Sequence, residues 1–189
     1  LNAGGMPSNL VLNEFKFEHQ CASQLLGHYF LVNFLYKYNR INEGARIVWI
    51  SSGGMYLKTL DLESLFNSKN YNKLSTYANV KRAQVTLVEE MSRQKKWGNT
   101  KIFCMHPGWV YTKGLRDSLP KFFNLMKNRL RTSEEGSDTI LWLLLTKKNI
   151  ESGGFYFDRE IVSPYILDYM KPSLEKRELL LKKMEEIFN

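Results

Sequence analysis

The chain has 189 residues, a length that suits one domain. Its 43% share of hydrophobic residues can fill a core, and no apolar run approaches the roughly 20 residues of a membrane-spanning helix. The formal net charge is +8, and the isoelectric point lies near 9.4. Because no helix-turn-helix, zinc-finger or RNA-recognition pattern accompanies this charge, we do not predict nucleic acid as a partner.

The two cysteines predict neither a disulfide framework nor a metal site. Cys21 and Cys104 each have a histidine two residues away, in His19-Gln20-Cys21 and Cys104-Met105-His106. The order and spacing match no standard zinc-ligand pattern. We therefore expect no metal, and two free thiols in a reducing compartment such as the cytoplasm.

The first half of the chain predicts a helix, a strand and a second helix. Apolar residues recur at helical spacing over residues 14–38. Arg46 to Ile50 form a short continuous run of β-branched and aromatic residues, which is typical of a strand buried on both faces of a parallel sheet. Residues 53–75 are polar and predict no regular element, and residues 76–96 predict the next helix.

The second half continues this alternation. We expect a strand, two helices, a short strand and a last helix over residues 100–105, 119–130, 132–144, 153–157 and 172–188. Thr132-Ser133-Glu134-Glu135 has the spacing of a capping box, and Pro172 suits the first turn of the last helix. Strands that alternate with helices predict a parallel α/β sheet in one domain, residues 1–189.

A phenol and an ammonium group lie four residues apart, at Tyr77 and Lys81. On a helix, positions i and i+4 share a face. A neighbouring cation lowers the pKa of a tyrosine by favouring the phenolate, so the pair suits general acid–base chemistry. The alternative is a surface tyrosine beside a solvated lysine, because so short a spacing is expected about once by chance.

Three further motifs surround this pair in order. Asn2-Ala3-Gly4 opens the chain, Ser51-Ser52-Gly53 follows the first predicted strand, and Pro107-Gly108-Trp109-Val110-Tyr111-Thr112 follows the second. The ordered set resembles the short-chain dehydrogenase/reductases, a family of nicotinamide-dependent Rossmann enzymes, and within it the retinol-dehydrogenase-like branch. The resemblance runs from Leu1 to about Asp158.

The resemblance implies an oxidoreductase that interconverts a small-molecule carbonyl and an alcohol with NAD or NADP. Tyr77 would be the general acid, Lys81 would hold the nicotinamide ribose, and Ser52 would hydrogen-bond the substrate oxygen. Ser51 is chemically identical, but the resemblance selects the second serine of the pair. Besides Tyr77 and Lys81, the cofactor-binding positions that it implies are Asn2, Ala3, Gly4, Pro107, Gly108, Val110 and Thr112. No oligomeric state is predicted.

One catalytic position departs from the family pattern. The family has a helix asparagine that completes a proton relay, four residues before the histidine of a Leu-Gly-His run. Here that run is Leu26-Gly27-His28, and Gln24 occupies the asparagine position. Glutamine carries the same amide one methylene further out, so the relay is either kept with a shifted geometry or broken.

No Gly-x-x-x-Gly-x-Gly stretch occurs in the chain. In the family this loop follows the first strand and holds the pyrophosphate at a helix N-terminus. Leu1 stands where the family's fourth strand should be ending. We therefore expect the carboxy-terminal portion of a Rossmann-like doubly wound parallel sheet flanked by helices, a partial domain that is inactive and binds no dinucleotide by itself. The alternative function is a non-catalytic remnant or interaction module.

Residues 113–131 hold six cations and one acid, opposite an apolar stripe. In the family the equivalent segment forms a lid over the substrate. A basic amphipathic helix over residues 119–131 would also suit peripheral contact with a membrane. A helix packed on its own domain with a solvated charged face is the third interpretation.

Overall fold

A four-stranded sheet forms the centre of the computed structural model, which describes residues 1–67, 69 and 71–188. Its strands follow the order β1-β2-β3-β4, with bounds Arg46–Ile50, Lys101–Met105, Phe155–Phe157 and Glu160–Ile161. β1, β2 and β3 are parallel, and β4 pairs antiparallel with β3. The register of β1 on β2 runs from Arg46 opposite Lys101 to Ile50 opposite Met105. The predicted parallel α/β sheet flanked by helices is therefore confirmed.

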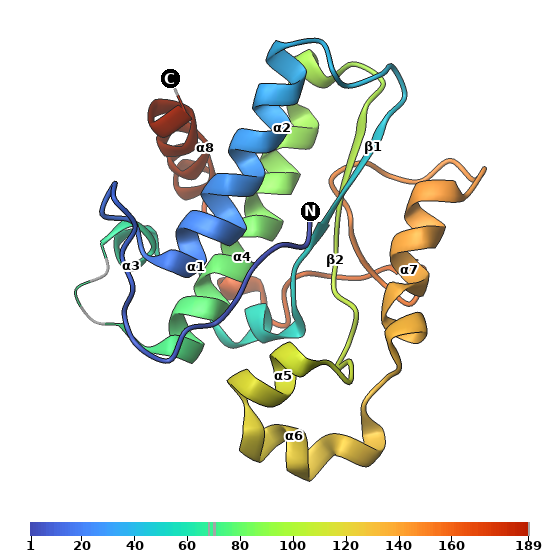
Figure 1. Cartoon of the computed structure of the whole chain (residues 1–189). Helices are drawn as coiled ribbons and strands as arrows, with labels where there is room; N and C mark the ends of the chain where they lie inside the picture. The colour runs from blue at the N-terminus through green and yellow to red at the C-terminus, as the bar shows by residue number, and fades with distance from the viewer. Residues whose placement is uncertain (68, 70, 189) are drawn as a thin grey trace.

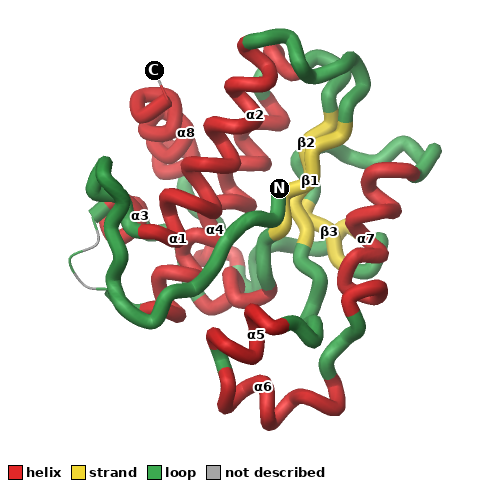
Figure 2. The backbone as a smooth tube through the Cα atoms, in the orientation of Figure 1, coloured by secondary structure: helices red, strands yellow, loops and turns green. Residues whose placement is uncertain are grey.

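Helices cover both faces of this sheet. In Figure 1, α2, α4 and α8 lie on one side of β1 and β2, and α7 lies on the other. Figure 2 shows the strands in yellow between these two layers. The bounds of the four helices are Gly27–Lys37, Lys73–Arg93, Leu174–Phe188 and Ser133–Leu145.

Side chains of the strands alternate between two apolar cores. Trp49 and Cys104 point into the core under α2, α4 and α8, whereas Val48 and Phe103 point into the core under α7. All four are buried. After the charged first residues Arg46 and Lys101, both faces of β1 and β2 are covered, which explains the apolar runs at residues 47–50 and 102–105.

The first predicted helix begins later than expected. Its regular part starts at α1 (His19–Cys21), continues through a π-helical segment, η1 (Ala22–Leu26), and ends with α2. Asn13 accepts hydrogen bonds from the backbone N–H groups of Phe15 and Phe17, and this local turn competes with helix formation. Glu18 then caps α1 by accepting from two backbone N–H groups.

The stretch 53–75 was predicted to lack regular structure, and this prediction is wrong. It contains a 3₁₀ turn, η2 (Gly53–Leu57), a short helix, α3 (Leu62–Phe66), and the start of α4. Side chains of Ser52, Asp61 and Asn72 cap these three elements. Such short capped elements carry too few residues for a periodic pattern. Residues 68 and 70 lie outside the described part of the chain.

α5 (Lys113–Ser118), β4 and the 3₁₀ turn η5 (Asp168–Met170) were not predicted. The helix predicted over residues 119–130 is shorter than expected, because α6 (Pro120–Met126) ends in the 3₁₀ turn η4 (Lys127–Arg129). The capping box is confirmed at the start of α7, where Thr132 accepts from the N–H of Glu135 and the Glu135 carboxylate accepts from the N–H of Thr132.

Leu1 lies along the outer edge of β1. Its terminal ammonium donates to the Val48 carbonyl at 2.7 Å, and its carbonyl accepts from the Ile50 N–H at 3.0 Å. This pairing brings residues 2–4 close to the carboxyl end of β1, where the side chains described next are also found.

Candidate active site

Helix α4 supports both members of the predicted acid–base pair. Lys81 is buried, and its ammonium donates to the Ile50 carbonyl at the end of β1, at 2.8 Å. The same ammonium lies 5.5 Å from the centre of the Tyr77 ring. The predicted shared helix face is therefore present, and the Lys81 side chain joins α4 to the strand that precedes Ser52.

The two adjacent serines have different surroundings. The Ser51 hydroxyl donates to the Lys81 carbonyl at 2.9 Å and is buried, so it ties β1 to α4. The Ser52 hydroxyl caps η2 by accepting from the Gly54 N–H at 3.1 Å. A Cβ atom on Gly54 would lie 3.5 Å from both the Ser52 hydroxyl and the Tyr77 ring. Ser52 and Tyr77 therefore face the same small space.

The pKa of Tyr77 shifts in the direction opposite to the expected one. Burial raises this pKa above its ordinary value of 10, and a hydrogen bond with the Ser52 side chain acts in the lowering direction. The expected lowering by Lys81 is not found because burial of the phenol dominates and the Lys81 ammonium is held at the Ile50 carbonyl. The neutral phenol, which is the form that can donate a proton, is thus the favoured form at neutral pH.

Burial lowers the pKa of Lys81 to about 8 from its ordinary value of 10.5. Between these two values the unfolded chain binds a proton that the native chain has released, so native stability rises with pH across this window. We expect this gain to reach the order of 3 kcal/mol. Urea unfolding at several pH values should show it as a difference between the wild type and Lys81→Met. Equal pH slopes for the two proteins would contradict the assignment.

Gln24 lies in the π-helical segment η1, and such segments are frequent at functional sites. Its side chain is 2% exposed and donates to the Gly5 carbonyl at 2.8 Å. Its own backbone carbonyl accepts from the Gln84 side chain of α4 at 2.6 Å. Among the described residues, no hydrogen bond links the Gln24 amide to Tyr77 or Lys81. Its part in a proton relay therefore stays a prediction, while its contact with the chain start is a finding.

The motif Asn2-Ala3-Gly4 is exposed and lies beside the buried side chain of Gln24. The buried ring of His28 lies close to the Ala3 backbone. Burial lowers the pKa of His28 to about 4, the positive charges of the chain terminus and Lys81 act in the same direction, and the Ala3 backbone opposes them. His28 is therefore neutral at neutral pH.

Gly4 and Gly5 form a matched pair for testing this contact. A Cβ on Gly4 would lie 2.4 Å from Cγ of Gln24, whereas a Cβ on Gly5 would meet nothing within 4 Å. Because Gln24 is buried and hydrogen-bonded, it cannot move away without losing its partner. We expect Gly4→Ala to cost about 1–3 kcal/mol of unfolding free energy, and Gly5→Ala to stay within about 0.5 kcal/mol. Denaturant unfolding measures both, and equal costs would refute the close contact.

The segment after β2 turns at Pro107 and Gly108 and then leads to Thr112, which caps the next helix. Pro107 leads into Gly108, whose φ of +77° is the left-handed conformation that glycine adopts readily. A Cβ on Gly108 would lie 2.9 Å from Nε of Arg131. The Thr112 hydroxyl caps α5 by accepting from the Leu115 N–H at 3.1 Å, and it can still donate a hydrogen bond.

Val110 occupies the middle of a short parallel bridge. The Trp109 carbonyl accepts from the Arg131 N–H, and the Tyr111 N–H donates to the Arg131 carbonyl, each at 2.8 Å. Val110 also packs against α7, since a Cβ on Gly136 would lie 2.5 Å from its Cγ2. This bridge fixes the position of the segment that the resemblance assigns to the nicotinamide end of the cofactor.

His106 is a site residue that the sequence did not single out for this role. Its Nδ1 accepts from the Gly108 N–H at 3.3 Å, and its ring stacks on Phe157 with 4.2 Å between ring centres. Burial, together with the nearby Arg131, lowers the pKa of His106 to about 4, and Asp158 opposes this shift. A neutral His106 can accept this hydrogen bond, so it shapes the Pro107–Gly108 turn. The sequence signal that could have indicated this role is the position of His106 directly before Pro107-Gly108.

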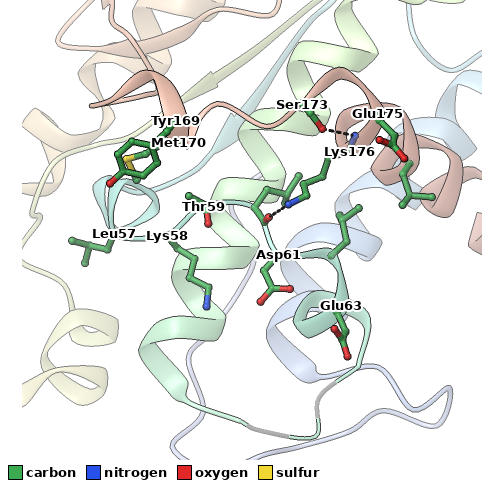
Figure 3. A pocket seen from close by; sticks show the side chains of 13 residues that line it. Leu57, Lys58, Thr59, Asp61, Glu63, Tyr169, Met170, Ser173, Glu175 and Lys176 are labelled. Carbon is green, nitrogen blue, oxygen red and sulfur yellow. Dashed lines mark hydrogen bonds between the residues drawn. The ribbon is translucent and has the colours of Figure 1, made fainter.

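An open pocket of about 750 Å³ lies away from Tyr77, between the loop after η2 and the chain's last segments. Figure 3 shows Lys58, Asp61 and Glu63 on one wall and Tyr169, Ser173 and Lys176 on the other. Neither Tyr77 nor Lys81 lines it. Within residues 1–67, 69 and 71–188, no group of three or more histidine, cysteine, aspartate or glutamate side chains is placed to hold a metal ion.

Comparisons with known proteins agree with the motif order. No family model matches the chain. It is 33% identical to dehydrogenase/reductase SDR family member 12 of Bos taurus, over 98% of this chain and 59% of that protein, and the Homo sapiens protein of the same name matches equally well. Retinol dehydrogenase 14 of Mus musculus is 29% identical over 82% of this chain and 48% of its own length.

Two solved structures share the fold. An uncharacterized protein from Mycobacterium Paratuberculosis superposes with a TM-score of 0.70 at 22% identity, covering 98% of this chain and 65% of the other. The structure described as ElxO with NADP bound gives a TM-score of 0.55 at 19% identity, covering 82% of this chain and 62% of that one.

These similarities define a Rossmann-like α/β chain related to oxidoreductases. More narrowly, the predicted resemblance to the short-chain dehydrogenase/reductases is confirmed, and the chain is similar to SDR family member 12 over 98% of its own length. The chain spans about 59% of the length of these first relatives.

Proposed function

We propose that the full-length natural protein is an NAD(P)-dependent oxidoreductase that interconverts a carbonyl and an alcohol. The observation that carries this proposal is the convergence of Ser52, Tyr77 and Lys81 at the carboxyl end of β1. In open α/β sheets, ligands bind at the carboxyl ends of the strands. Relatives named as dehydrogenases and reductases, and a structural neighbour with NADP bound, support the same chemistry.

The side chains present fit a nicotinamide cofactor. The Lys81 ammonium has three donors, of which one is directed to Ile50, so it can also bind ribose hydroxyls. The Thr112 hydroxyl and the backbone of Val110 would hold the carboxamide, next to Pro107 and Gly108. Asn2, Ala3 and Gly4 would line the same side of the sheet. Bound there, a nicotinamide would supply or accept the hydride.

The chain's own residues would handle the proton. For carbonyl reduction, the Ser52 hydroxyl donates to the substrate oxygen and stabilises its developing negative charge. Tyr77, kept neutral by burial, then gives its proton to that oxygen as a general acid. The positive charge of Lys81, 5.5 Å from the centre of the Tyr77 ring, would offset part of the cost of the buried phenolate that remains. Gln24 would take part in returning a proton to Tyr77.

The direct test is hydride transfer by the purified full-length natural protein. Absorbance of reduced nicotinamide is followed with NADH and with NADPH, against a panel of aldehydes and ketones, and the reverse direction is run with alcohols. Turnover with either cofactor would support the proposal. Failure of every pair, together with no calorimetric binding of NADH or NADPH, would favour the alternative of a non-catalytic interaction module.

Residues 119–131 carry a second, separate proposal, a peripheral contact with an anionic membrane. Leu125 is 81% exposed, and the cations Lys121, Lys127 and Arg129 on the same segment are also exposed. An exposed apolar side chain among cations suits an anionic lipid surface. Among the described residues, no helix is long and apolar enough to cross a membrane. Sedimentation with anionic phospholipid vesicles should pull down the wild type more than Leu125→Glu, and equal recovery would refute the contact.

A further inference from the structure

Arg82 follows Lys81 directly on α4, and it is a fully buried charged residue. An arginine in a helix usually lies at the surface, because removing its charge from water is costly unless its donors are satisfied. Among the described residues, no carboxylate forms a salt bridge with Arg82. Its partners are backbone carbonyl groups, so the residue holds main chain in place instead of neutralising an acid.

The Arg82 guanidinium joins two separate segments. Its Nη2 donates to the Met55 carbonyl at 3.1 Å, and its Nε donates to the Lys58 carbonyl at 3.2 Å. Its Nη1 donates to the Pro164 carbonyl at 2.8 Å. The first two acceptors belong to the turn that begins directly after Ser52, and the third lies beyond β4. A rigid fork of donors suits three such acceptors, whereas a lysine has a single ammonium on a flexible stem.

Other contacts reinforce the same junction. The Arg82 guanidinium lies 5.0 Å from the centre of the Tyr165 ring. Tyr56, within η2, donates its hydroxyl to the Ser163 carbonyl at 2.6 Å. Lys176 of α8, labelled in Figure 3 on the wall of the open pocket, donates to the Leu60 carbonyl at 3.3 Å. The turn after Ser52 is thus held between α4 on one side and residues 163–176 on the other.

We propose that Arg82 is a positioning residue that fixes the turn carrying Ser52 relative to Tyr77 and makes this geometry depend on residues 163–165. Its relevance to catalysis rests on the proposed oxidoreductase function. The Ser52 hydroxyl is the N-cap of η2, so a shift of Met55 or Lys58 moves the residues that this hydroxyl caps. Arg82 is bonded at the far end of η2 and does not touch the reacting atoms.

The experiment compares Arg82→Lys with Arg46→Lys in the full-length natural protein. Arg46 is the matched control, because its guanidinium also donates to a backbone carbonyl, that of Leu143, at 2.7 Å, but on the other side of the sheet. Hydrogen exchange read by mass spectrometry reports on the backbone of residues 53–59. We expect Arg82→Lys to speed exchange there about tenfold, the loss of about one hydrogen bond. Exchange in α7 should stay unchanged, and Arg46→Lys should leave residues 53–59 protected.

Kinetics supply the second readout. Arg82→Lys should lower kcat about tenfold or more while the KM for the nicotinamide cofactor changes less than about threefold, because the substrate-side hydroxyl is displaced and the ribose contacts are kept. Unchanged exchange over residues 53–59 would overturn the proposal, and so would an equal increase in α7, which would indicate a general loss of stability. Hydrogen exchange can be measured on a protein without activity. An absence of turnover would therefore refute the proposed function, while exchange over residues 53–59 would still test the role of Arg82.

A second pair of variants tests the proposal if Arg82→Lys does not fold. Tyr165→Leu removes the aromatic face beneath the guanidinium, and Tyr165→Phe keeps it. Faster exchange at residues 53–59 in the leucine variant than in the phenylalanine variant would support the proposal, and equal exchange would count against it.

Discussion

Replacing Tyr77 with phenylalanine should lower turnover of the full-length natural protein by about 10²–10⁴-fold, the contribution typical of a positioned general acid. The substitution removes only the hydroxyl, and the ring would keep its place beside Gly54 and under the Lys81 ammonium. Since Lys81 and the segment after β2 are untouched, the affinity for NADH or NADPH should change little. Steady-state rates and calorimetric titration of the same preparations separate the two effects.

Tyr36→Phe is the control for this substitution. Tyr36 lies near the end of α2, and its ring packs against Trp97 at 5.1 Å between ring centres. Trp97 follows the C-terminal end of α4, whereas Tyr77 lies near the start of that helix. Its variant should retain wild-type turnover. Near-normal turnover of Tyr77→Phe would remove Tyr77 from the proposed mechanism. A parallel loss of cofactor binding would instead indicate that the hydroxyl holds the ribose and contributes little to proton transfer.

The strands could be predicted because both of their faces are buried. A residue of β1 or β2 contacts one core or the other, so the apolar run and the strand share nearly the same bounds. β4 gave no such signal, since its residues Glu160 and Ile161 are exposed. Its turn is equally unmarked, because Asp158 and Arg159 adopt positive φ values of 49° and 64° where asparagine and glycine are the usual residues.

The candidate site was predicted from motif order, not from physical pattern alone. Ser52, Tyr77 and Lys81 are brought together because the end of β1 and the first turns of α4 meet at one edge of the sheet. Arg82 could not be predicted in this way. Charged residues within a helix are expected to face water, and the three carbonyls that justify its burial come from distant or irregular segments. The charged cluster of Glu89 and Glu90 on α4 with Arg177 on α8 could not be predicted for the same reason.

Arg177 of α8 should be among the most costly single residues to neutralise. It is 5% exposed, and it pairs with Glu89 at 2.7 Å and with Glu90 at 2.5 Å, both on α4. Arg177→Met would leave two largely buried carboxylates without this partner. We expect a loss of about 3–5 kcal/mol of unfolding free energy at neutral pH, the cost typical of breaking a buried ion pair. Denaturant unfolding monitored by circular dichroism measures it.

Arg93→Met is the matched control, because Arg93 pairs with the same Glu90 but its side chain is 60% exposed. Such an exposed pair contributes about 0–1 kcal/mol, so this variant should stay close to the wild type.

The pH dependence of the unfolding free energy of Arg177→Met gives a further check. Burial already raises the pKa of Glu89, and Arg177 opposes that rise. Without Arg177, the native chain binds protons more readily than the unfolded chain, so the deficit of Arg177→Met should shrink as the pH falls towards about 5. A deficit that is constant with pH, or as small as that of Arg93→Met, would show that the cluster does not hold α8 to α4.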